Sequence, residues 1–410
     1  MTIAAVSTLE GVSPSLGKSP VRADPVDFYG YRELLTSDES ARLDELRRFL
    51  EAEVAPIADD FWERAESPRH LFRPLADLGI YGAGFPEVAE FENSALFRGW
   101  VSYELARVDS SVATMAGVHC GLAMNAVAVG GSDEQRADLL PKMARGEIVG
   151  AFGLTEPLSG SDTARGLRTT ARRDGDAWVL NGAKRWIGNA TFADIVIIWA
   201  RDVADGNVKG FLVPRHTPGF TATKIERKQS LRAVENADIV LTGVRVSESS
   251  RLERVRSFRE VATVLRKTRS DVAWQALGNG VGAYEAAVAY ARSREQFGRP
   301  IGSYQLVQSK LVTALTDITA SIALCTRTAQ LQEADRLTDE QSAMAKATVS
   351  ERMRRVVALC REVLGGNGIQ LDYGVARRFA DAEAIYTYEG THDMNTLIVG
   401  RAITGIPAFT

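Results

Sequence analysis

The segment AIYTYEGTHDMN, residues 384–395, holds a carboxylate in a setting that suits acid–base chemistry. Glu389 follows Tyr386 and Tyr388 and directly precedes Gly390. Aromatic side chains that displace water raise the pKa of a carboxylate from about 4.3 toward the pH at which a base works. A glycine has no Cβ, so the backbone can approach a ligand closely at Gly390. A capping or surface glutamate is the alternative without chemistry, and this segment alone leaves both interpretations open.

A second segment, AFGLTEPLSGSDTA at 151–164, places hydroxyl groups in a turn-rich stretch after a short apolar run. The hydroxyls of Thr155, Ser159 and Ser161, with free backbone N–H groups, suit an anionic or amide-rich ligand such as a pyrophosphate. An ordinary polar hairpin loop has the same composition. The residues of this segment alone leave both interpretations open.

The segment GNGVGA, residues 278–283, matches the glycine spacing of a dinucleotide-binding fingerprint. That fingerprint requires a preceding strand, whereas RSDVAWQAL has a helical pattern. We therefore interpret these small residues as close helix packing and predict no Rossmann domain.

Composition argues against nucleic acid as the main partner. The 410 residues are 45% hydrophobic and 25% charged, with a formal net charge of −3, as in an ordinary soluble globular protein. A net negative chain gives no electrostatic case for nucleic acid or anionic membrane. The basic stretch 251–269 is interrupted by Glu253 and Glu260 and lacks stacking aromatics, so we interpret it as a solvated helix face.

Neither a metal site nor a disulfide framework is predicted. The cysteines and histidines are scattered: Cys120, Cys325, Cys360, His70, His119, His216 and His392. The first 29 residues lack a basic cluster followed by a long apolar core, so we expect a flexible leader and no signal peptide. We also expect no apolar run long enough to span a membrane. The predicted location is cytoplasmic.

Helical patterns occupy the region up to about residue 150. Thr36 and Glu39 have the spacing of a capping box, and Pro56 should interrupt the helix that follows. The nearly uncharged stretch SSVATMAGVHCGLAMNAVAVGG, 110–131, is predicted to be a buried helix that also lines a pocket.

Short β-rich runs replace the helical pattern between about 151 and 252. Turns are expected at Asn181-Gly182, Asp205-Gly206 and Pro218-Gly219. The short spacing leaves no room for crossover helices, so we predict an antiparallel barrel or sandwich.

Long amphipathic stretches then predict a helical bundle, with a Thr338–Gln341 capping box and a helix end at Gly365-Gly366. The expected fold class is α+β multidomain, in the order helical, β, helical. The predicted divisions are a leader at 1–29, a helical domain at 30–150, a β-domain at 151–252 and a four-helix bundle at 253–410.

Four motifs together resemble the acyl-CoA dehydrogenase flavoprotein family. They are GLTEPLSGSD, SREQFGRPIGSYQLVQSKL, LGGNGI and YEGTHDMNTLIVGRAITG, in the family's order and at its distances. The resemblance covers roughly 30–410 and is closest to glutaryl-CoA dehydrogenases and plant short-chain acyl-CoA oxidases. It implies the same three-domain fold, an FAD cofactor, an acyl-CoA substrate and a role in fatty acid metabolism.

The resemblance also implies roles for matching residues. Glu389 would be the catalytic base. The residues implied to hold the cofactor are Phe152, Gly153, Leu154, Thr155, Ser161, Trp186, Ile187, Gly188, Arg294, Phe297, Gln305, Glu362, Gly365, Gly366 and Thr391. The residues implied to meet the substrate are Ser161, Arg269 and Gly390. Trp186 would cover the flavin, while Arg294 and the residues after it would reach the FAD of a neighbouring subunit. The implied assembly is therefore a homotetramer.

Two departures bear on the reaction. Glutaryl-CoA dehydrogenases carry an arginine for the distal carboxylate where this chain has Ala113, which argues against a dicarboxylic substrate because a buried unpaired carboxylate is costly. Many dehydrogenases have threonine where this chain has Gly188, and the glycine would leave space that admits oxygen near the flavin.

The resulting prediction is dehydrogenation of a short or branched monocarboxylic acyl-CoA to the trans-2-enoyl-CoA, with electrons passed to an electron-transfer flavoprotein. An acyl-CoA oxidase that uses oxygen is the alternative, and a glutaryl-CoA dehydrogenase-like activity is the second. A catalytically silent flavoprotein or a nucleic-acid-binding module is the alternative from another class. The intact Glu389 and the negative net charge disfavour both.

Overall fold

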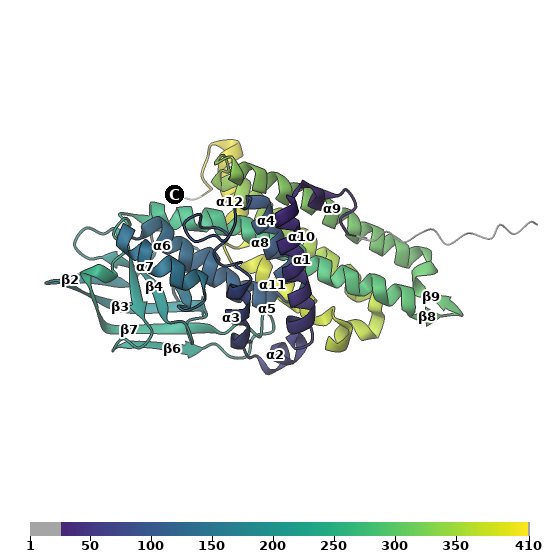
Figure 1. Cartoon of the computed structure of the whole chain (residues 1–410), viewed down its shortest axis with the longest axis horizontal. Helices are drawn as coiled ribbons and strands as arrows, with labels where there is room; N and C mark the ends of the chain where they lie inside the picture. Colours follow the sequence, from purple (N-terminus) through teal and green to yellow (C-terminus); the bar gives the residue numbers. More distant parts are fainter. Residues whose placement is uncertain (1–25, 409–410) are drawn as a thin grey trace, which may run out of the picture.

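The computed structural model describes residues 26–408, and the three-part architecture expected from the sequence is confirmed. The N-terminal helices and the C-terminal bundle lie against one side of a curled sheet, and the bundle extends away from it to the β8–β9 end (Figure 1). The predicted leader lies outside the described residues except for 26–29.

The N-terminal region is helical. Its elements are η1 (Tyr31–Leu34), α1 (Ser37–Phe49), η2 (Leu50–Val54), α2 (Ala58–Arg64), η3 (Arg69–Leu71), α3 (Phe72–Asp77), α4 (Ala95–Val108), α5 (Ser110–Ala116), η4 (Gly117–Met124), α6 (Asn125–Gly130) and α7 (Asp133–Ala144). The Thr36–Glu39 capping box is confirmed, since each side chain accepts from the other's backbone N–H, at 3.2 and 2.9 Å. A π-helical turn, η2, ends just before Pro56, so the predicted interruption is also confirmed.

The helical stretch α5–η4–α6 forms the wall between the helices and the sheet. Its helix, Ser110–Gly130, is long and apolar enough to cross a membrane by length and composition, so the expectation that no such run exists is wrong. Its mean hydropathy is 1.5, and 56% of its most apolar window is buried inside the structure. It packs against β1 and α8, and a buried core helix of a soluble protein has the same properties.

The middle region is a seven-stranded sheet. Its strands are β1 (Gly150–Gly153), β2 (Thr170–Asp174), β3 (Ala177–Gly188), β4 (Ile195–Asp202), β5 (Val208–Pro214), β6 (Phe220–Lys224) and β7 (Asn236–Ser247), followed by η5 (Glu248–Ser250). The order is β1-β4-β2-β3-β7-β6, with β5 on the other edge of β4.

Two details of the predicted sheet are wrong. The sheet is not wholly antiparallel, because β4 runs parallel to both β1 and β2. The β2–β3 hairpin serves as the crossover between β1 and β4, so no helix is needed. Asn181-Gly182 does not form a turn but lies inside β3, at a register shift opposite β7 where Gly182 has φ 149°. The strands on both sides of this β-bulge continue the ladder.

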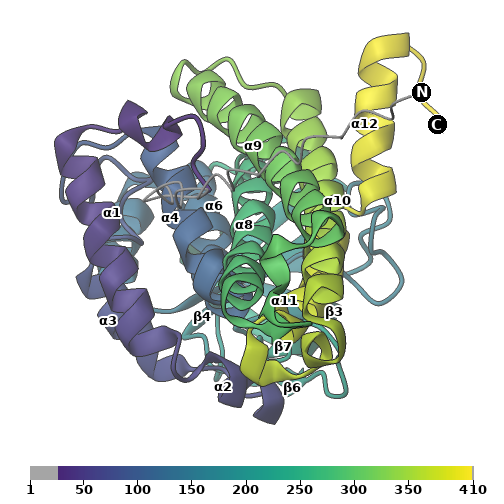
Figure 2. The ribbon, with the colours of Figure 1, turned by 90° about the vertical axis from the view of Figure 1, so that its right-hand side faces the viewer.

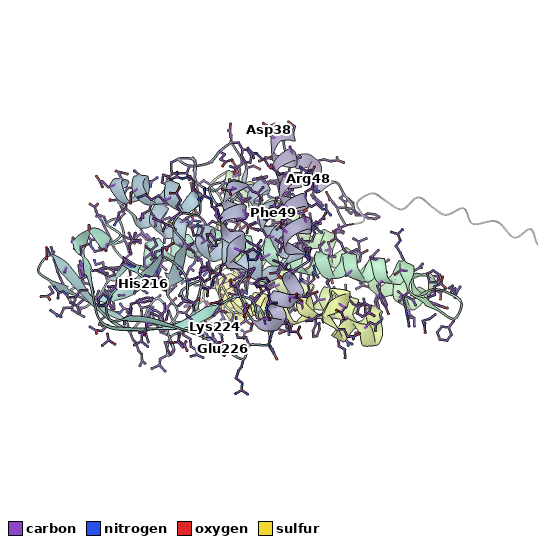
Figure 3. All side chains as sticks on the ribbon, turned by 60° about the horizontal axis from the view of Figure 1, so that its bottom comes forward. Asp38, Arg48, Phe49, His216, Lys224 and Glu226 are labelled. Atoms are coloured by element: carbon purple, nitrogen blue, oxygen red, sulfur yellow. The ribbon has the colours of Figure 1, made fainter. Side chains whose placement is uncertain are left out.

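β1 and β4 are buried on both faces and join the sheet to the helices. Phe152 and Trp199 belong to the helical core, whereas Ala151 and Ile198 belong to the separate core of the sheet. The edge strand β6 contacts the N-terminal region, because Lys224 Nζ donates to Ala65 O at 2.6 Å. The same ammonium lies 3.8 Å from Glu226 (Figure 3). Because β1 packs against both the helical core and the core of the sheet, the loop after β1 lies at the junction of the two domains.

The C-terminal region forms the predicted bundle. Its elements are α8 (Phe258–Ser293), β8 (Glu295–Gln296), β9 (Arg299–Pro300), η6 (Ile301–Ser303), α9 (Gln305–Glu333), α10 (Asp339–Leu364), η7 (Gly365–Ile369), η8 (Leu371–Tyr373), α11 (Ala376–Thr387) and α12 (His392–Thr404). The predicted Thr338–Gln341 capping box and the end of α10 at Gly365 are confirmed. GNGVGA lies inside α8, so the packing interpretation is also confirmed. The basic stretch 251–269 is helical only from Phe258 onward.

α11 is fixed by ion pairs and hydrogen bonds to the N-terminal and middle regions. Arg377 donates to Asp59 at 2.7 Å and to Asp109 at 2.5 Å. Asp381 accepts from the Trp62 indole at 2.8 Å and from the backbone N–H of Leu231 at 2.6 Å. α12 instead projects from the side of the bundle (Figure 2). The segment between α11 and α12 therefore begins at a rigid helix.

His119 links β1 to the helical wall and should make stability depend on pH. Its Nδ1 accepts from Gly150 N at 3.0 Å, its Nε2 donates to Met143 O at 2.9 Å, and burial lowers its pKa to about 4. Above the unfolded pKa of about 6.5 both states are neutral. As pH falls from about 6.5 toward 4, only the unfolded state gains the proton, so stability is progressively lost.

The expected loss between pH 7 and pH 5 is roughly 2 kcal/mol. Urea unfolding at the two pH values measures it, and the difference should shrink in His119→Gln but persist in the exposed control His216→Gln. An unchanged difference in His119→Gln would contradict this assignment.

Candidate active site

Glu389 lies in the short connection between α11 and α12, in an unusual backbone conformation. Its φ is 54°, in the left-handed region that few non-glycine residues occupy, and Gly390 follows with φ 87°. The Gly390 φ itself favours glycine, in addition to the close approach expected from the sequence. One carboxylate oxygen of Glu389 accepts from the Thr268 hydroxyl of α8 at 3.0 Å. The turn therefore directs the carboxylate toward α8.

Lys346, a buried residue of α10, holds this turn. Its ammonium donates to Tyr386 O at 2.7 Å and to Gly390 O at 2.9 Å, on the two sides of Glu389. Asn395 Nδ2 donates to the same Gly390 oxygen at 2.8 Å. Two backbone carbonyls that would otherwise lie unpaired near the interior are thereby satisfied.

The electrostatics of the turn favour a basic carboxylate. Burial raises the pKa of Glu389, while the Thr268 hydrogen bond and the charges of Arg269 and Lys346 oppose that rise. Burial lowers the pKa of Lys346 to about 8, against the attraction of Glu389. A carboxylate whose pKa lies above its ordinary value accepts a proton more readily at neutral pH.

The wall beside Glu389 is made by Tyr388 and α8. The Tyr388 hydroxyl donates to Gln275 Oε1 at 2.9 Å, and Gln275 Nε2 donates to Ala113 O at 3.5 Å. Tyr388 thus helps to enclose the carboxylate, as expected. Tyr386 does not, because its ring stacks on His392 at 4.9 Å and lies under Arg354 at 4.3 Å. The expectation of an apolar setting built by both tyrosines is wrong for Tyr386.

Three residues of this site were missed by the sequence analysis: Thr268, Gln275 and Lys346. Lys346 had a detectable signal, because it stands alone in the small-residue run AMAKATV on a helix. Thr268 and Gln275 had none, since hydroxyl and amide groups are ordinary on long helices. Their contacts depend on how α8 packs against the turn.

The loop after β1 meets the end of β3. Arg185 N donates to Thr155 O at 2.8 Å, and the buried pair of Lys184 and Glu156, 2.8 Å apart, lies behind it. Glu156 also accepts from the backbone of Thr169 at 2.9 Å. Phe152–Thr155 and Trp186–Gly188 are thereby brought together, as the motif resemblance implied.

Trp186 has features that suit a stacked planar ligand. It is 50% exposed despite its size, and its φ of 65° turns it out of the strand. Asn236 Nδ2 supports the turned backbone by donating to Trp186 O at 3.3 Å. A half-exposed indole beside a loop with hydroxyl groups fits the ring of a flavin.

The space expected at Gly188 is largely filled. A Cβ added to Gly188 would meet Val118 Cγ2 of η4 at 3.0 Å. The glycine therefore allows close helix approach, and the expectation that it leaves open space for oxygen is wrong on this side.

The remaining predicted residues fall into separate places. Arg269 neighbours Thr268 on α8, and its Nε is buried without a partner in the described chain. Thr391 caps α12 by accepting from Met394 N at 3.2 Å, and Ser161 is exposed. A second group lies in and beside β8, β9 and the adjoining ends of α8, α9 and α10: Arg294, Phe297, Gln305, Glu362, Gly365 and Gly366. Arg294, Glu362 and Gly365 line a cavity of about 250 Å³ there. The two groups are therefore separate within the described chain, and a role at a neighbouring subunit's cofactor stays a prediction.

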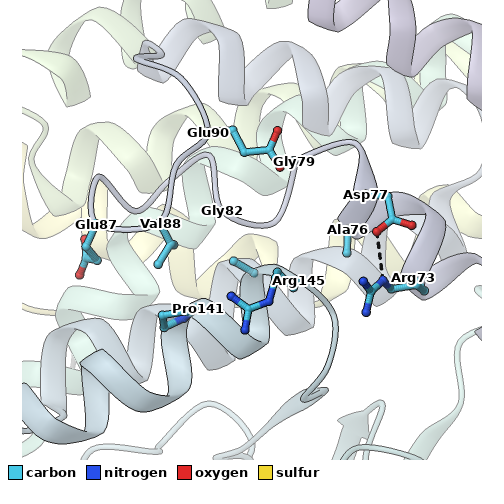
Figure 4. Close-up of a pocket in the computed structure, with 11 residues that line it drawn as sticks. Arg73, Ala76, Asp77, Gly79, Gly82, Glu87, Val88, Glu90, Pro141 and Arg145 are labelled. Atoms are coloured by element: carbon cyan, nitrogen blue, oxygen red, sulfur yellow. Dashed lines mark hydrogen bonds and ion pairs between the residues drawn. The ribbon is translucent and has the colours of Figure 1, made fainter.

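A further cavity of the described chain lies elsewhere. It measures about 500 Å³ and is lined by residues of α3, the loop after it and α7, among them Arg73, Glu90 and Arg145 (Figure 4). It contains none of the predicted site residues. Within residues 26–408 no cluster of His, Cys, Asp and Glu side chains could hold a metal ion.

Three family models match nearly the whole described chain. They are the acyl-CoA dehydrogenase N-terminal domain at 36–147, the middle domain at 151–244 and the C-terminal domain at 258–404. A probable acyl-CoA dehydrogenase of Bacillus subtilis is 32% identical over 379 residues, 90% of this chain and 98% of the relative.

Two solved structures are similar along their whole length. A glutaryl-CoA dehydrogenase from Mycobacterium smegmatis in complex with FADH2 has a TM-score of 0.91 and 35% identity, covering 94% of this chain and 99% of the neighbour. A butyryl-CoA dehydrogenase from Megasphaera elsdenii has a TM-score of 0.86 and 30% identity, covering 90% and 98%.

Removal of the Lys346 ammonium should change both the rate and its pH dependence. Lys346→Met deletes two hydrogen bonds to the turn, and the misplaced carboxylate should slow anaerobic flavin reduction by about 10- to 100-fold. It also deletes a cation near Glu389, so the apparent pKa of the reduction rate should rise. A purely structural role would lower the rate at every pH without moving that pKa.

Lys346→Arg retains the charge and should keep the apparent pKa near that of the parent. Lys142→Met, at an exposed lysine paired with Asp138, serves as the matched control and should change neither quantity. A Lys346→Met variant with the parent's pH profile would contradict the electrostatic part of this role.

Proposed function

The chain belongs to the acyl-CoA dehydrogenase family of FAD-dependent oxidoreductases that act on the CH–CH group of an acyl-CoA, and we propose that it dehydrogenates a short or branched monocarboxylic acyl-CoA. The product is the trans-2-enoyl-CoA, and the electrons pass to an electron-transfer flavoprotein. The observation that carries this proposal is the Glu389 carboxylate, held by Thr268 on a clamped turn with its pKa raised by burial.

Glu389 acts as the base. The α-proton of a thioester is a very weak acid, so its removal needs a positioned base and a polarised carbonyl. The carboxylate of Glu389 takes the α-proton, and the backbone N–H of Glu389, which has no acceptor in the described chain, donates to the thioester oxygen. FAD, when bound, supplies the acceptor for the hydride that leaves the β-carbon.

Other residues bind and orient the cofactor and the substrate. Thr155 and the backbone around it hold the flavin ring together with Trp186, and Arg294 reaches the cofactor of a neighbouring subunit. An arginine suits this role because its fork of donors can bind phosphate oxygens bidentately. Gly390 lets the backbone approach the thioester.

The walls of the site favour a short acyl chain without a distal carboxylate. Ala113 supplies no cation, and Gln275 closes the wall behind Tyr388 with an uncharged amide. Burial of a second carboxylate against such groups is unfavourable. The glutaryl-CoA activity of one structural neighbour is the competing candidate, and the unpaired Nε of Arg269 is the feature that would favour it.

Two further features support the proposed electron acceptor and the proposed assembly. Val118 packs against Gly188, which supports a dehydrogenase over an oxidase because less space is left for oxygen beside that strand. Large apolar side chains are exposed at the far end of the bundle and on α12: Phe297 at 94%, Leu306 at 79%, Ile369 at 71% and Ile403 at 77%. Such surfaces support a homotetramer in which subunits share cofactor sites. We propose a cytoplasmic enzyme of fatty acid metabolism.

Anaerobic bleaching of the FAD-loaded protein tests the proposal. Butyryl-CoA or isobutyryl-CoA should reduce the flavin faster than glutaryl-CoA, because the site lacks a cation placed for a distal carboxylate. The reduced protein should then be reoxidised quickly by an electron-transfer flavoprotein and slowly by air. A preference for glutaryl-CoA would contradict the substrate class, and stoichiometric peroxide at the full turnover rate would make the protein an oxidase.

A further inference from the structure

A second carboxylate lies on the same face of α8 as the groups that contact the Glu389 turn. Thr268 donates to Glu389, and Gln275 accepts from Tyr388. Asp271 lies three residues after Thr268 and four before Gln275, so all three share one face of the helix. Asp271 therefore faces the region enclosed by the turn.

Gly121 of η4 faces Thr268 and Asp271 from the opposite wall, with no side chain of its own to cover them. A Cβ added to Gly121 of η4 would lie 3.7 Å from Thr268 Cγ2 and 3.8 Å from Asp271 Oδ2, at ordinary contact distance. The charge of Asp271 raises the pKa of the neighbouring Cys120 thiol, next to burial as the main cause. Cys120, Asp271, Tyr388 and Glu389 are enclosed by protein, yet each keeps part of its surface accessible. The charge of Asp271 acts on Cys120 and on Glu389, so the three side chains are neighbours.

Asp271 has no partner for its carboxylate within residues 26–408. It makes no hydrogen bond there, and burial raises its pKa to about 7. Arg98 of α4 and Lys267 of α8 attract it without a hydrogen bond or an ion pair. The Arg98 guanidinium already donates to Asn93, at 3.0 and 3.1 Å, and lies 3.9 Å from Glu333. A structural carboxylate at such a position would normally be paired.

We propose that Asp271 is a specificity-determining residue that rejects acyl chains with a distal carboxylate and accepts a hydrogen bond from a hydroxyl group on a short acyl chain. This inference rests on the proposed function, because it places the acyl chain between Glu389 and the wall made by η4 and α8. A carboxylate that enters this space meets a second anion in a poorly solvated setting, where like charges repel strongly. A hydroxyl group instead satisfies the unpaired oxygens of Asp271.

The charge of Asp271 and the absence of a cation at Ala113 act differently on a distal carboxylate. A missing cation only fails to stabilise a distal carboxylate, whereas a second anion works against it. Specificity then includes a repulsive element directed at a competing substrate class. The favoured class is a short acyl-CoA with a hydroxyl group beyond the β-carbon.

The test compares three thioesters in anaerobic flavin reduction at pH 8: butyryl-CoA, glutaryl-CoA and 4-hydroxybutyryl-CoA. Asp271→Asn keeps the shape of the side chain and removes its charge. It should raise the efficiency with glutaryl-CoA relative to butyryl-CoA by about tenfold or more. Asp271→Val also removes the acceptor and should lower the efficiency with 4-hydroxybutyryl-CoA relative to butyryl-CoA by about fivefold.

Asp60→Asn, which removes one exposed carboxylate on α2, is the matched charge control and should leave both ratios unchanged. Retained FAD and parental circular dichroism establish that the Asp271 variants are folded, and Asp271→Ser serves if one is not. Ratios in Asp271→Asn and Asp271→Val that stay within twofold of the parent's would overturn the inference. A parent protein that none of the three thioesters bleaches would instead contradict the proposed function.

Discussion

The buried ammonium of Lys346 is the interaction on which the site depends. It binds the carbonyls of Tyr386 and Gly390 and so holds the turn in which Glu389 occupies a left-handed conformation. A non-glycine residue in that region is strained and persists only where the surroundings fix it. The same cation stabilises the carboxylate charge that burial opposes. Lys346 of α10 thus contributes both to the position of Glu389 and to its basicity, together with burial, Thr268 and Arg269.

Three sets of buried polar contacts position the elements around this turn. α11 is fixed to the N-terminal helices and to the segment before β7 by Arg377 and Asp381, so the turn starts from a rigid base. His119 ties β1 to the helical wall, and the Lys184–Glu156 pair joins the loop after β1 to β3. The loop proposed to hold the cofactor and the proposed base lie on separate domains, and buried polar contacts between those domains determine their relative placement.

The sequence predicted the fold well because the local signals agreed with one another. A few neighbouring residues were enough to predict the capping boxes at Thr36 and Thr338, the helix end at Gly365 and the apolar runs of the strands. Asn181-Gly182 misled because a turn dipeptide also suits a β-bulge, and only strand pairing distinguishes the two. The parallel pairs of β4 depend on long-range topology, and the apolar helix 110–130 has the composition of a membrane span but the surroundings of a core.

In the site, Glu389 and the loop at 152–155 carried motif signals. Thr268, Gln275 and Asp271 became visible only when α8 was packed against the turn, because spacing along one helix does not show what it faces.

The central claim is that Glu389 is the base that removes the α-proton. Glu389→Gln keeps the shape of the side chain and its Thr268 contact but cannot take a proton at neutral pH. Rapid mixing of the FAD-loaded variant with butyryl-CoA in the absence of oxygen is the most direct measurement. The account predicts that FAD and acyl-CoA still bind, while the rate of flavin bleaching falls by about 10² to 10⁴-fold relative to the parent. Bleaching at close to the parent's rate would show that another group removes the proton.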